Sequence, residues 1–438
     1  MPRPQRSSTP SPFALALALS LGAAVSLGIT RFAYGLLLPP MRADLQWSYT
    51  LAGGMNTANA LGYLLGALAA PRLIGRHGGS PVLVAGAALA SLFMGLSGFF
   101  TDAVPLLLQR GLAGVASALL FVAGGLLAAR LGAVLPQQSG LLLGIYYGGT
   151  GLGIVLSAVL VPVLLEASRG RAHGWAWAWW ALALACLGAT LVLLWPARVM
   201  RRLERVQEQD APGPQSASAA GRAAETGWVE RVGQAEGAAG QPMPNARPAS
   251  DRPFRWRAFA PALAGYAMFG MGYIGYMTFV IALLRELGVE AGRVTWFYAL
   301  LGVAVMASSR IWAGLLDRHR SGRALALLNA LLGVAIVIPA LTFAWPLLLA
   351  SGLLFGGVFL SVVASTTALV RHNLPSAQWA AGISAFTVVF AAGQIVGPTV
   401  VGWIADGPGG LARGLLFSAG ALWVGALLAS RQRALPVM

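Results

Sequence analysis

The stretch FALALALSLGAAVSLGITRFAYGLLLPP occupies residues 13–40 and carries one charged side chain, that of Arg31. A helix needs about 20 consecutive, mostly apolar residues to cross the hydrocarbon core of a bilayer. Arg3 and Arg6 precede the stretch, as basic residues do in a secretory signal, but the apolar residues continue past residue 35 without a small-residue cleavage site. We therefore predict that residues 13–40 form a transmembrane helix.

Eleven further apolar runs of similar length follow along the chain. They lie near residues 50–71, 81–100, 103–129, 139–165, 174–196, 258–284, 293–316, 324–343, 345–370, 379–404 and 412–430. Of the 438 residues, 57% are hydrophobic and 10% are charged, whereas a soluble globular chain has about a quarter charged residues. The sequence therefore predicts an all-α membrane protein with twelve transmembrane helices in contact with the lipid bilayer.

Arginine accounts for all 30 basic residues, and its distribution predicts the orientation. With the N-terminus in the cytoplasm, the loops on that side hold 21 arginines and the opposite loops hold six; without the long central loop the split is 11 to six. The positive-inside rule then places both termini in the cytoplasm of a multi-pass protein of the inner (plasma) membrane. The net charge of +16 could indicate a nucleic-acid partner, but the arginines are spread between apolar runs, so none is expected.

Residues 197–256 differ from the rest because they are rich in Pro, Gly, Ala, Ser and mixed charge. This composition predicts a largely disordered cytoplasmic linker between two six-helix halves, residues 1–196 and 257–438. The halves also resemble repeats: an offset of 244 places Gly149 and Gly153 on Gly393 and Gly397, and Arg76 on Arg320. Since six spans is an even number, the two bundles are expected to share an orientation and to be pseudo-symmetric about an axis along the membrane normal.

Several motifs resemble those of the major facilitator superfamily. They are GLLDRHRSGR (314–323), QRGLAGVASA (109–118) and GQIVGPTVVG (393–402). More narrowly, ITRFAYGLLLPPM (29–41) and NTANALGYLLGA (56–67) are similar to the YbfB/YjiJ-like branch. The resemblance covers nearly the whole chain outside the linker and implies a transporter that works by alternating access around a central cavity. The loop APRLIGRHGG (70–79) departs from the family pattern because it lacks the usual Asp, which puts a gate on that side in doubt.

Charged side chains inside the spans indicate where a solute would bind. A charge at bilayer depth is costly, so Arg31 and Arg110 are expected to face a cavity or a partner, at about 13 Å and 10 Å below the outer ends of their helices. Arginine recognises carboxylate or phosphate with two parallel hydrogen bonds. The predicted substrate site comprises Arg31, Tyr34, Asn56, Asn59, Tyr63, Arg110 and Tyr273. Alternatively, each arginine hydrogen-bonds carbonyl groups or extends to the interface and ties helices together.

Two further sets of residues have predicted roles in movement and packing. The gating set, which the family resemblance favours, is Arg310, Asp317, Arg318, Arg320 and Arg323; Arg310 and Asp317 are seven apart and so expected on one helix face. The alternative for this set is ordinary topology-setting charge. The helix-packing set, whose members let helix backbones approach closely or kink, is Gly149, Gly153, Gly393, Gly397 and Pro398.

Missing residue types exclude several functions. The chain has no Lys, which a P-loop ATPase requires, and Cys186 and the four histidines form no metal-ligand pattern. The sequence has no cluster of a nucleophile and a base that would indicate an enzyme, and no cofactor or metal is expected.

The sequence thus predicts a monomeric secondary or facilitative transporter of a small solute, and a small organic anion is the favoured solute. The alternative is an exporter of amphipathic or drug-like solutes, and a remote alternative is a membrane sensor or scaffold that does not transport. No Asp or Glu lies inside a span, which disfavours proton coupling through a buried carboxylate but leaves a coupling ion open.

Overall fold

A computed structural model describes residues 11–135, 138–210, 255–375 and 378–435 of the chain, and no strand occurs in them. The helices of the first half are α1 (Pro12–Ala23), α2 (Tyr34–Leu45), α3 (Tyr49–His77), α4 (Gly79–Leu96), α5 (Ala103–Val134), α6 (Ser139–Ala167) and α7 (Trp175–Asp210). Those of the second half are α9 (Ala260–Glu286), α10 (Ala291–Ile311), α11 (Ala313–Arg318), α12 (Arg323–Leu341), α13 (Trp345–Asn373), α14 (Trp379–Ala405) and α15 (Gly410–Ser430).

Eleven helical segments of the described residues are long and apolar enough to cross a membrane. The 29-residue α3 supplies the twelfth span, and its hydropathy is lower because it carries Asn56, Thr57 and Asn59. The fold class predicted from the sequence is therefore confirmed. α7 continues through residues 197–210, which the predicted linker includes. Residues 198–210 belong to a second unit, and residues 211–254 of that linker lie outside the described part of the chain.

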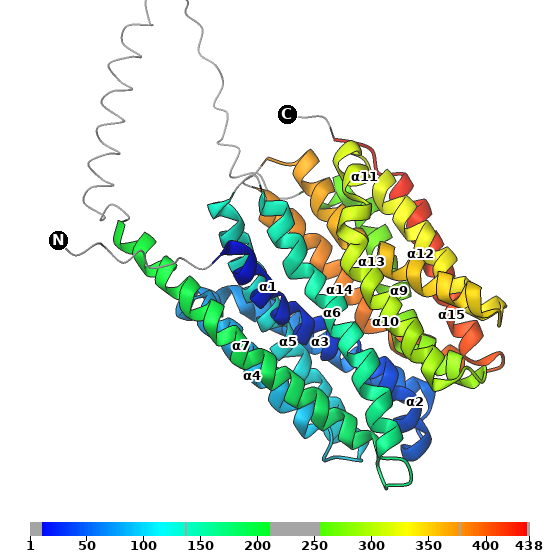
Figure 1. Cartoon of the computed structure of the whole chain (residues 1–438). Helices are drawn as coiled ribbons and strands as arrows, with labels where there is room; N and C mark the ends of the chain where they lie inside the picture. Colours follow the sequence, from blue (N-terminus) through cyan, green and yellow to red (C-terminus); the bar gives the residue numbers. More distant parts are fainter. Residues whose placement is uncertain (1–10, 136–137, 211–254, 376–377, 436–438) are drawn as a thin grey trace, which may run out of the picture. The chain divides into compact units, whose positions relative to one another are not determined.

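The two halves pair their helices in the same pattern (Figure 1). In the first half, the second span contacts the fourth (α3 with α5), the third contacts the fourth (α4 with α5), and the first contacts the fifth (α1 with α6). The second half repeats these contacts with α10 and α13, α12 and α13, and α9 and α14. Between the halves, α2 contacts α9, α3 contacts α14, and α6 contacts α10. α1 begins and α15 ends at one end of this unit, the end predicted to be cytoplasmic (Figure 1).

Glycines set the closest of these approaches. A Cβ atom on Gly149 would lie 1.9 Å from the carbonyl oxygen of Ser20, and one on Gly153 would lie 2.3 Å from that of Ala24. On α14, a Cβ on Gly393 would lie 2.3 Å from the Ala267 oxygen, and one on Gly397 would lie 2.5 Å from the Met271 oxygen. The fifth and eleventh spans therefore contact the first and seventh spans backbone to backbone, which any larger side chain would prevent.

The contact between the halves is equally close on α14. Pro398 lies inside this helix, and its carbonyl oxygen would be 2.1 Å from a Cβ on Gly53 of α3. On α6, a Cβ on Gly151 would lie 2.3 Å from the Gly302 oxygen of α10. Side chains do not separate the two halves at these points.

The first span is a broken helix, where one continuous helix was predicted. After α1, residues Ala24–Ile29 are π-helical, and regular helix resumes only at Tyr34. Two backbone bonds span five residues: Thr30 N donates to Val25 O at 3.0 Å, and Phe32 N donates to Leu27 O at 3.1 Å. The Thr30 hydroxyl also donates to Val25 O, at 2.7 Å, and so competes with the regular helical bond. The break frees backbone carbonyls at the level of Arg31.

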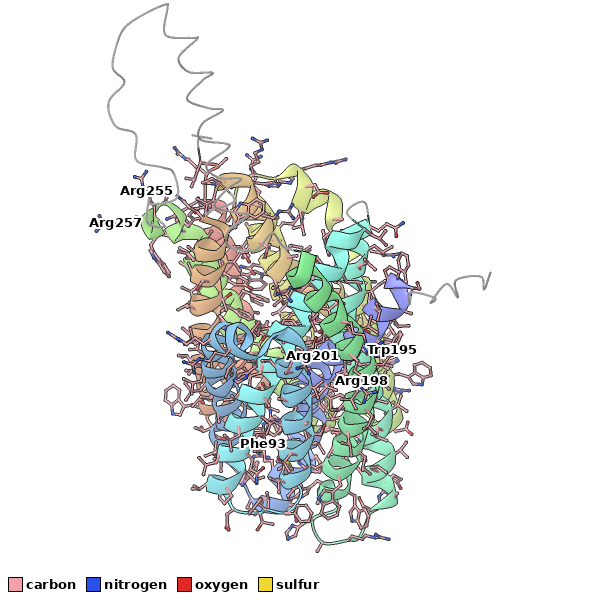
Figure 2. All side chains as sticks on the ribbon, turned by 90° about the vertical axis from the view of Figure 1, so that its left-hand side faces the viewer. Phe93, Trp195, Arg198, Arg201, Arg255 and Arg257 are labelled. Atoms are coloured by element: carbon pink, nitrogen blue, oxygen red, sulfur yellow. The ribbon has the colours of Figure 1, made fainter. Side chains whose placement is uncertain are left out.

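Apolar side chains cover the outer surface of the helices. Leu65 on α3 is 54% exposed and Leu184 on α7 is 68% exposed. Figure 2 shows side chains projecting outward along the helices, Trp195 among them, while the exposed Arg255 and Arg257 lie where the chain enters α9. Large exposed apolar side chains over most of the surface fit a lipid environment better than water.

Candidate functional site

The break in the first span places Arg31 in the centre of the molecule. Its side chain is 2% exposed, and Nη2 donates a hydrogen bond to the side-chain oxygen of Gln394 on α14. The guanidinium lies 5.6 Å from the ring centre of Tyr63 on α3. Within the described residues, Arg31 Nε has no hydrogen-bond partner although it is buried. Arg31 therefore joins the two halves with one donor left unused.

Arg110 on α5 is buried in a different way. Its Nη1 donates to the Thr30 carbonyl oxygen at 2.8 Å, and its Nη2 donates to the Asn56 side-chain oxygen at 3.0 Å. The guanidinium lies 4.9 Å from the ring centre of Tyr34 and 5.8 Å from that of Trp179. Both terminal nitrogens of this arginine are thus held by protein acceptors, one of them a carbonyl freed by the broken helix. Its Nε, like that of Arg31, has no hydrogen-bond partner within the described residues.

A chain of amide groups extends this network. Asn56 Nδ2 donates to the Thr278 hydroxyl on α9 at 2.7 Å, and Asn59 Nδ2 donates to the Arg110 carbonyl oxygen at 3.1 Å. The Tyr34 hydroxyl donates to the Ala52 carbonyl oxygen at 2.9 Å. The structure therefore brings together six of the seven residues of the predicted substrate site, in the first half: Arg31, Tyr34, Asn56, Asn59, Tyr63 and Arg110.

Tyr273, the seventh, lies close enough to Arg31 for an electrostatic interaction and belongs to an aromatic cluster in the second half. Its ring stacks on Phe269, Phe359 and Phe390, with centroid distances of 4.8, 5.1 and 5.6 Å. Phe32, the residue after Arg31, meets Phe359 edge-on at 5.8 Å and so connects the cluster with the broken helix. At the centre of the molecule, the two arginines thus come from the first half and the stacked aromatic cluster comes from the second.

Three polar side chains of this centre were not singled out from the sequence. Gln394 contacts Arg31, Thr278 contacts Asn56, and the Tyr298 hydroxyl donates to the Phe32 carbonyl oxygen at 2.7 Å. All three come from the second half and are buried. The available signal was weak: an amide such as Gln394 inside an apolar run is costly at membrane depth and indicates a partner, but not which one.

The predicted outer end of the molecule holds another set of contacts between the halves. Asp406, just after α14, accepts hydrogen bonds from the backbone of Tyr49 at 2.7 Å and of Thr50 at 2.9 Å, and from the Thr50 hydroxyl at 2.6 Å. Tyr49 also donates its hydroxyl to Glu286, and Arg42 lies 3.7 Å from its ring centre. Burial alone would raise the pKa of Asp406, but the bonds from Thr50 and Tyr49 and the charge of Arg42 hold that pKa below its ordinary value.

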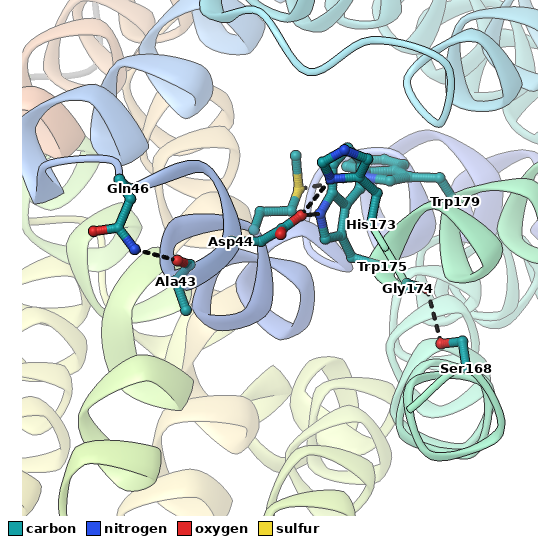
Figure 3. Close-up of polar contacts among 9 residues, drawn as sticks. Ala43, Asp44, Gln46, Ser168, His173, Gly174, Trp175 and Trp179 are labelled. Atoms are coloured by element: carbon teal, nitrogen blue, oxygen red, sulfur yellow. Dashed lines mark hydrogen bonds and ion pairs between the residues drawn. The ribbon is translucent and has the colours of Figure 1, made fainter. Parts of the chain in front are cut away.

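A cavity of about 490 Å³ opens near this end, lined by α2, α6, α9, α10 and the loop after α6. Asp44 on its wall is paired: one carboxylate oxygen accepts from Trp175 Nε1 at 2.5 Å and lies 2.6 Å from His173 Nδ1 (Figure 3). Arg171 and Arg285 also line the cavity. It does not reach the Arg31 layer, because Arg31, Arg110 and Asn56 are not among the lining residues.

The predicted gating residues lie at the opposite, predicted cytoplasmic end. α10 ends at Ile311 and α11 begins at Ala313, so Arg310 and Asp317 do not share one continuous helix, contrary to the spacing argument. The break occurs where Trp312 donates its Nε1 to the Gly357 carbonyl oxygen at 2.8 Å. All members of the set are exposed: Arg310, Asp317, Arg318, Arg320 and Arg323. Their gating role stays a prediction.

Comparison with known proteins identifies the class. The model of the family described as "Uncharacterised MFS-type transporter YbfB" matches residues 23–229 and 226–430, nearly the whole chain. The chain therefore belongs to this family of major facilitator superfamily transporters, and the resemblance noted in the sequence is confirmed.

Solved transporters share the fold at low sequence identity. The nucleoside transporter NupG is 12% identical with a TM-score of 0.64, covering 95% of this chain and 98% of that chain. The peptide transporter POT, solved in complex with sulfate, is 17% identical with a TM-score of 0.65, covering 98% of this chain and 96% of that chain. These likenesses support the twelve-helix fold and, at such identity, nothing about the solute.

Two curated relatives match over shorter stretches. "Probable anion transporter 4, chloroplastic" of Arabidopsis thaliana is 30% identical over 162 residues, 36% of this chain. "Multi-drug resistance efflux pump PmrA" of Streptococcus pneumoniae is 30% identical over 137 residues, 29% of this chain. The aligned part spans 29% of the first relative and 33% of the second, about a third of each. The two names point to different solute classes.

Proposed function

We propose that the protein is a secondary or facilitative transporter that carries a small organic anion by alternating access, with Arg31 as the anion-binding group. The observation that carries this proposal is the contact of Arg31 across the two halves: its buried guanidinium places Nη2 on a neutral amide of the other half and leaves Nε without a partner among the described residues. A buried polar group normally has its hydrogen bonds satisfied. A carboxylate can satisfy both donors.

The charge balance supports an anion. Arg31 and Arg110 are both buried, and among the described residues neither forms an ion pair with an acidic side chain. Two uncompensated guanidinium charges at bilayer depth are costly, and a bound anion would compensate part of that charge. A named anion transporter among the relatives is consistent with this solute class.

Arg110 has a different role in this proposal. Its terminal nitrogens already bond the Thr30 carbonyl and the Asn56 amide oxygen, so it holds the broken helix against α3 and α5. We therefore assign anion binding to Arg31 and a positioning role to Arg110. Tyr63 below the Arg31 guanidinium, and Tyr34 with Asn56 and Asn59 around Arg110, complete the site.

The aromatic side of the centre supports an alternative solute. Phe269, Tyr273, Phe359 and Phe390 form a stacked surface suited to amphipathic or drug-like molecules, and a multidrug efflux pump is among the relatives. Transport assays in proteoliposomes distinguish the two functions. If the protein exports a lipophilic cationic dye, and the Arg31→Leu variant exports it equally well, the alternative is favoured.

The decisive experiment measures anion uptake by proteoliposomes for wild type, Arg31→Lys and Arg31→Leu. Lysine keeps the charge but cannot offer two parallel donors, so we expect Arg31→Lys to lower uptake by about tenfold and Arg31→Leu by about a hundredfold. Arg293→Lys, at a surface arginine 5.6 Å from the Trp345 ring centre, is the matched control and should keep wild-type uptake. Unchanged uptake by Arg31→Leu would refute the proposed site.

Topology and organisation complete the proposal. We place the protein in the inner membrane as a monomer with both termini cytoplasmic, and residues 197–256 as a linker between bundles 1–196 and 257–438. The arginine distribution supports this orientation, as does the shared end at which α1 begins and α15 ends. A green fluorescent protein fused to the C-terminus should fluoresce, because it folds in the cytoplasm. A fusion that inserts normally into the membrane but does not fluoresce would indicate the opposite orientation.

A further inference from the structure

Gln394 occupies the position at Arg31 that the proposed function gives to the solute. Its side-chain oxygen accepts from Arg31 Nη2, and its own amide nitrogen has no partner within the described residues. We propose that Gln394 is an internal stand-in for the solute: its amide holds Arg31 when the site is empty, and the solute's carboxylate displaces it. This inference rests on the proposed anion transport and names the group that the site recognises.

The geometry of the guanidinium favours a carboxylate. Nε–H and Nη2–H point to the same side of an arginine and together match the two oxygens of a carboxylate. The Gln394 amide has one oxygen, which serves Nη2 and leaves the buried Nε unbonded. A carboxylate fills both positions and adds a negative charge. The Gln394 amide therefore binds Arg31 more weakly than a carboxylate would, so that a carboxylate solute can displace it.

Arg110 shows what a fixed contact looks like in the same molecule. Its acceptors, the Thr30 carbonyl and the Asn56 side chain, both belong to the first half, and two aromatic rings flank the guanidinium. Gln394 belongs to the other half, so exchanging it for a solute breaks a bond between the halves. Binding would thus remove one link between the two halves, and release of the solute would restore it.

Neighbouring rings favour a planar substituent on the carboxylate. Phe390 lies one helical turn before Gln394 and therefore on the same face of α14, and it is half-buried in the aromatic cluster. The ring centre of Tyr63 on α3 lies 5.6 Å from the Arg31 guanidinium. A carboxylate bound to Arg31 would carry its substituent beside these two rings. An aromatic carboxylate should therefore bind more tightly than acetate.

The test uses purified full-length protein titrated at pH 7 with benzoate, acetate and succinate, with binding measured by calorimetry and by the rise in melting temperature. Gln394→Glu places a permanent carboxylate on Arg31 and should weaken benzoate binding by at least about tenfold. Gln394→Leu removes the competing acceptor and should tighten it by about tenfold. Asn329→Leu removes a buried amide elsewhere in the same half, one that donates to the Gly265 carbonyl at 3.1 Å, and should leave affinity unchanged.

Opposite shifts by the two Gln394 variants are the expected result, because a purely structural glutamine would give weaker binding in both. Wild-type affinity in Gln394→Glu, or weaker binding in Gln394→Leu, overturns the inference. Benzoate binding that Arg31→Leu abolishes and neither Gln394 variant changes overturns this inference alone and leaves the proposed function standing. Failure of all three carboxylates to bind wild-type protein overturns the proposed function and this inference together.

Discussion

The surroundings of Arg31 and Arg110 differ in one respect that matters for function. Around Arg110, the acceptors, the flanking rings and the backbone all come from the first half, and both terminal nitrogens are bonded. Around Arg31, the acceptor comes from the second half. In both arginines the buried Nε has no hydrogen-bond partner among the described residues. What distinguishes the two is therefore which half of the protein supplies the acceptors: the first half alone for Arg110, and the second half for Arg31.

The largest expected effect is the loss of stability when Arg110, whose acceptors all lie in the first half, is replaced. Arg110→Leu leaves the Thr30 carbonyl and the Asn56 amide oxygen without donors in a buried layer, and each unsatisfied group costs about 1–3 kcal/mol. We expect the free energy of unfolding to fall by about 2–5 kcal/mol, measured by chemical or thermal unfolding in detergent. Arg31→Leu is the matched control and should change stability less. A stable Arg110→Leu protein without transport would instead show that Arg110 binds the solute.

A smaller effect is expected from Asn56, which connects the fixed network with the second half. Asn56→Leu removes the acceptor for Arg110 and the donor to Thr278, so we expect a loss of about 1–3 kcal/mol of stability. Thr278→Val removes the second bond together with the bond from the Thr278 hydroxyl to the Ile274 carbonyl oxygen at 2.6 Å, and should still cost less. The difference between the two variants in unfolding experiments is therefore a lower limit on the contribution of the Arg110 bond, and a larger loss in Thr278→Val would contradict the network.

The smallest effect concerns pH at the predicted outer end. The pKa of Asp406 is held below its ordinary value, so the stabilisation from this carboxylate is complete above the ordinary pKa and is lost as the pH falls through the lowered one. Between pH 5 and 8 the outer contact should therefore not vary. Stability measured across pH 3–8 should show a difference between wild type and Asp406→Asn that is constant above about pH 5 and shrinks in acid. A change of that difference near pH 6.5 would implicate a different group.

The fold could be predicted from the sequence because each long hydrophobic run corresponds to one transmembrane span. It placed the second span at 50–71 and the structure extends it to Tyr49–His77, since helices continue beyond the hydrocarbon core. It did not predict the π-helical turn at Ala24–Ile29, because apolar residues fill that turn as they fill an α-helix. The break at Trp312 was missed for the same reason.

For the site, the sequence could find costly residues but not their partners. Four polar residues of the site were recognisable, because a polar side chain at membrane depth is costly and is retained only where it has a partner or a function. They are Arg31, Arg110, Asn56 and Asn59. Gln394 lies 363 residues from Arg31, so only the packing of the two halves reveals the contact. Which half supplies the acceptors of each guanidinium is likewise a property of the folded chain.

The wide turn in the first span also makes the site depend on a count of residues. Each residue of an α-helix advances the side chains by about 100° around the axis, and a π turn holds one residue more than an α turn. Deleting one residue from Ala24–Ile29 would let the turn close into ordinary α-helix while the hydrophobic run kept its length. The residues after the turn would keep their direction relative to α1, because the extra residue is accommodated within the wide turn. The break itself would be lost, and the Thr30 carbonyl, which now accepts from Arg110, would return to regular helical bonding. Deleting a single codon would thus take one acceptor from Arg110 without turning Arg31 away from Tyr63 and Gln394.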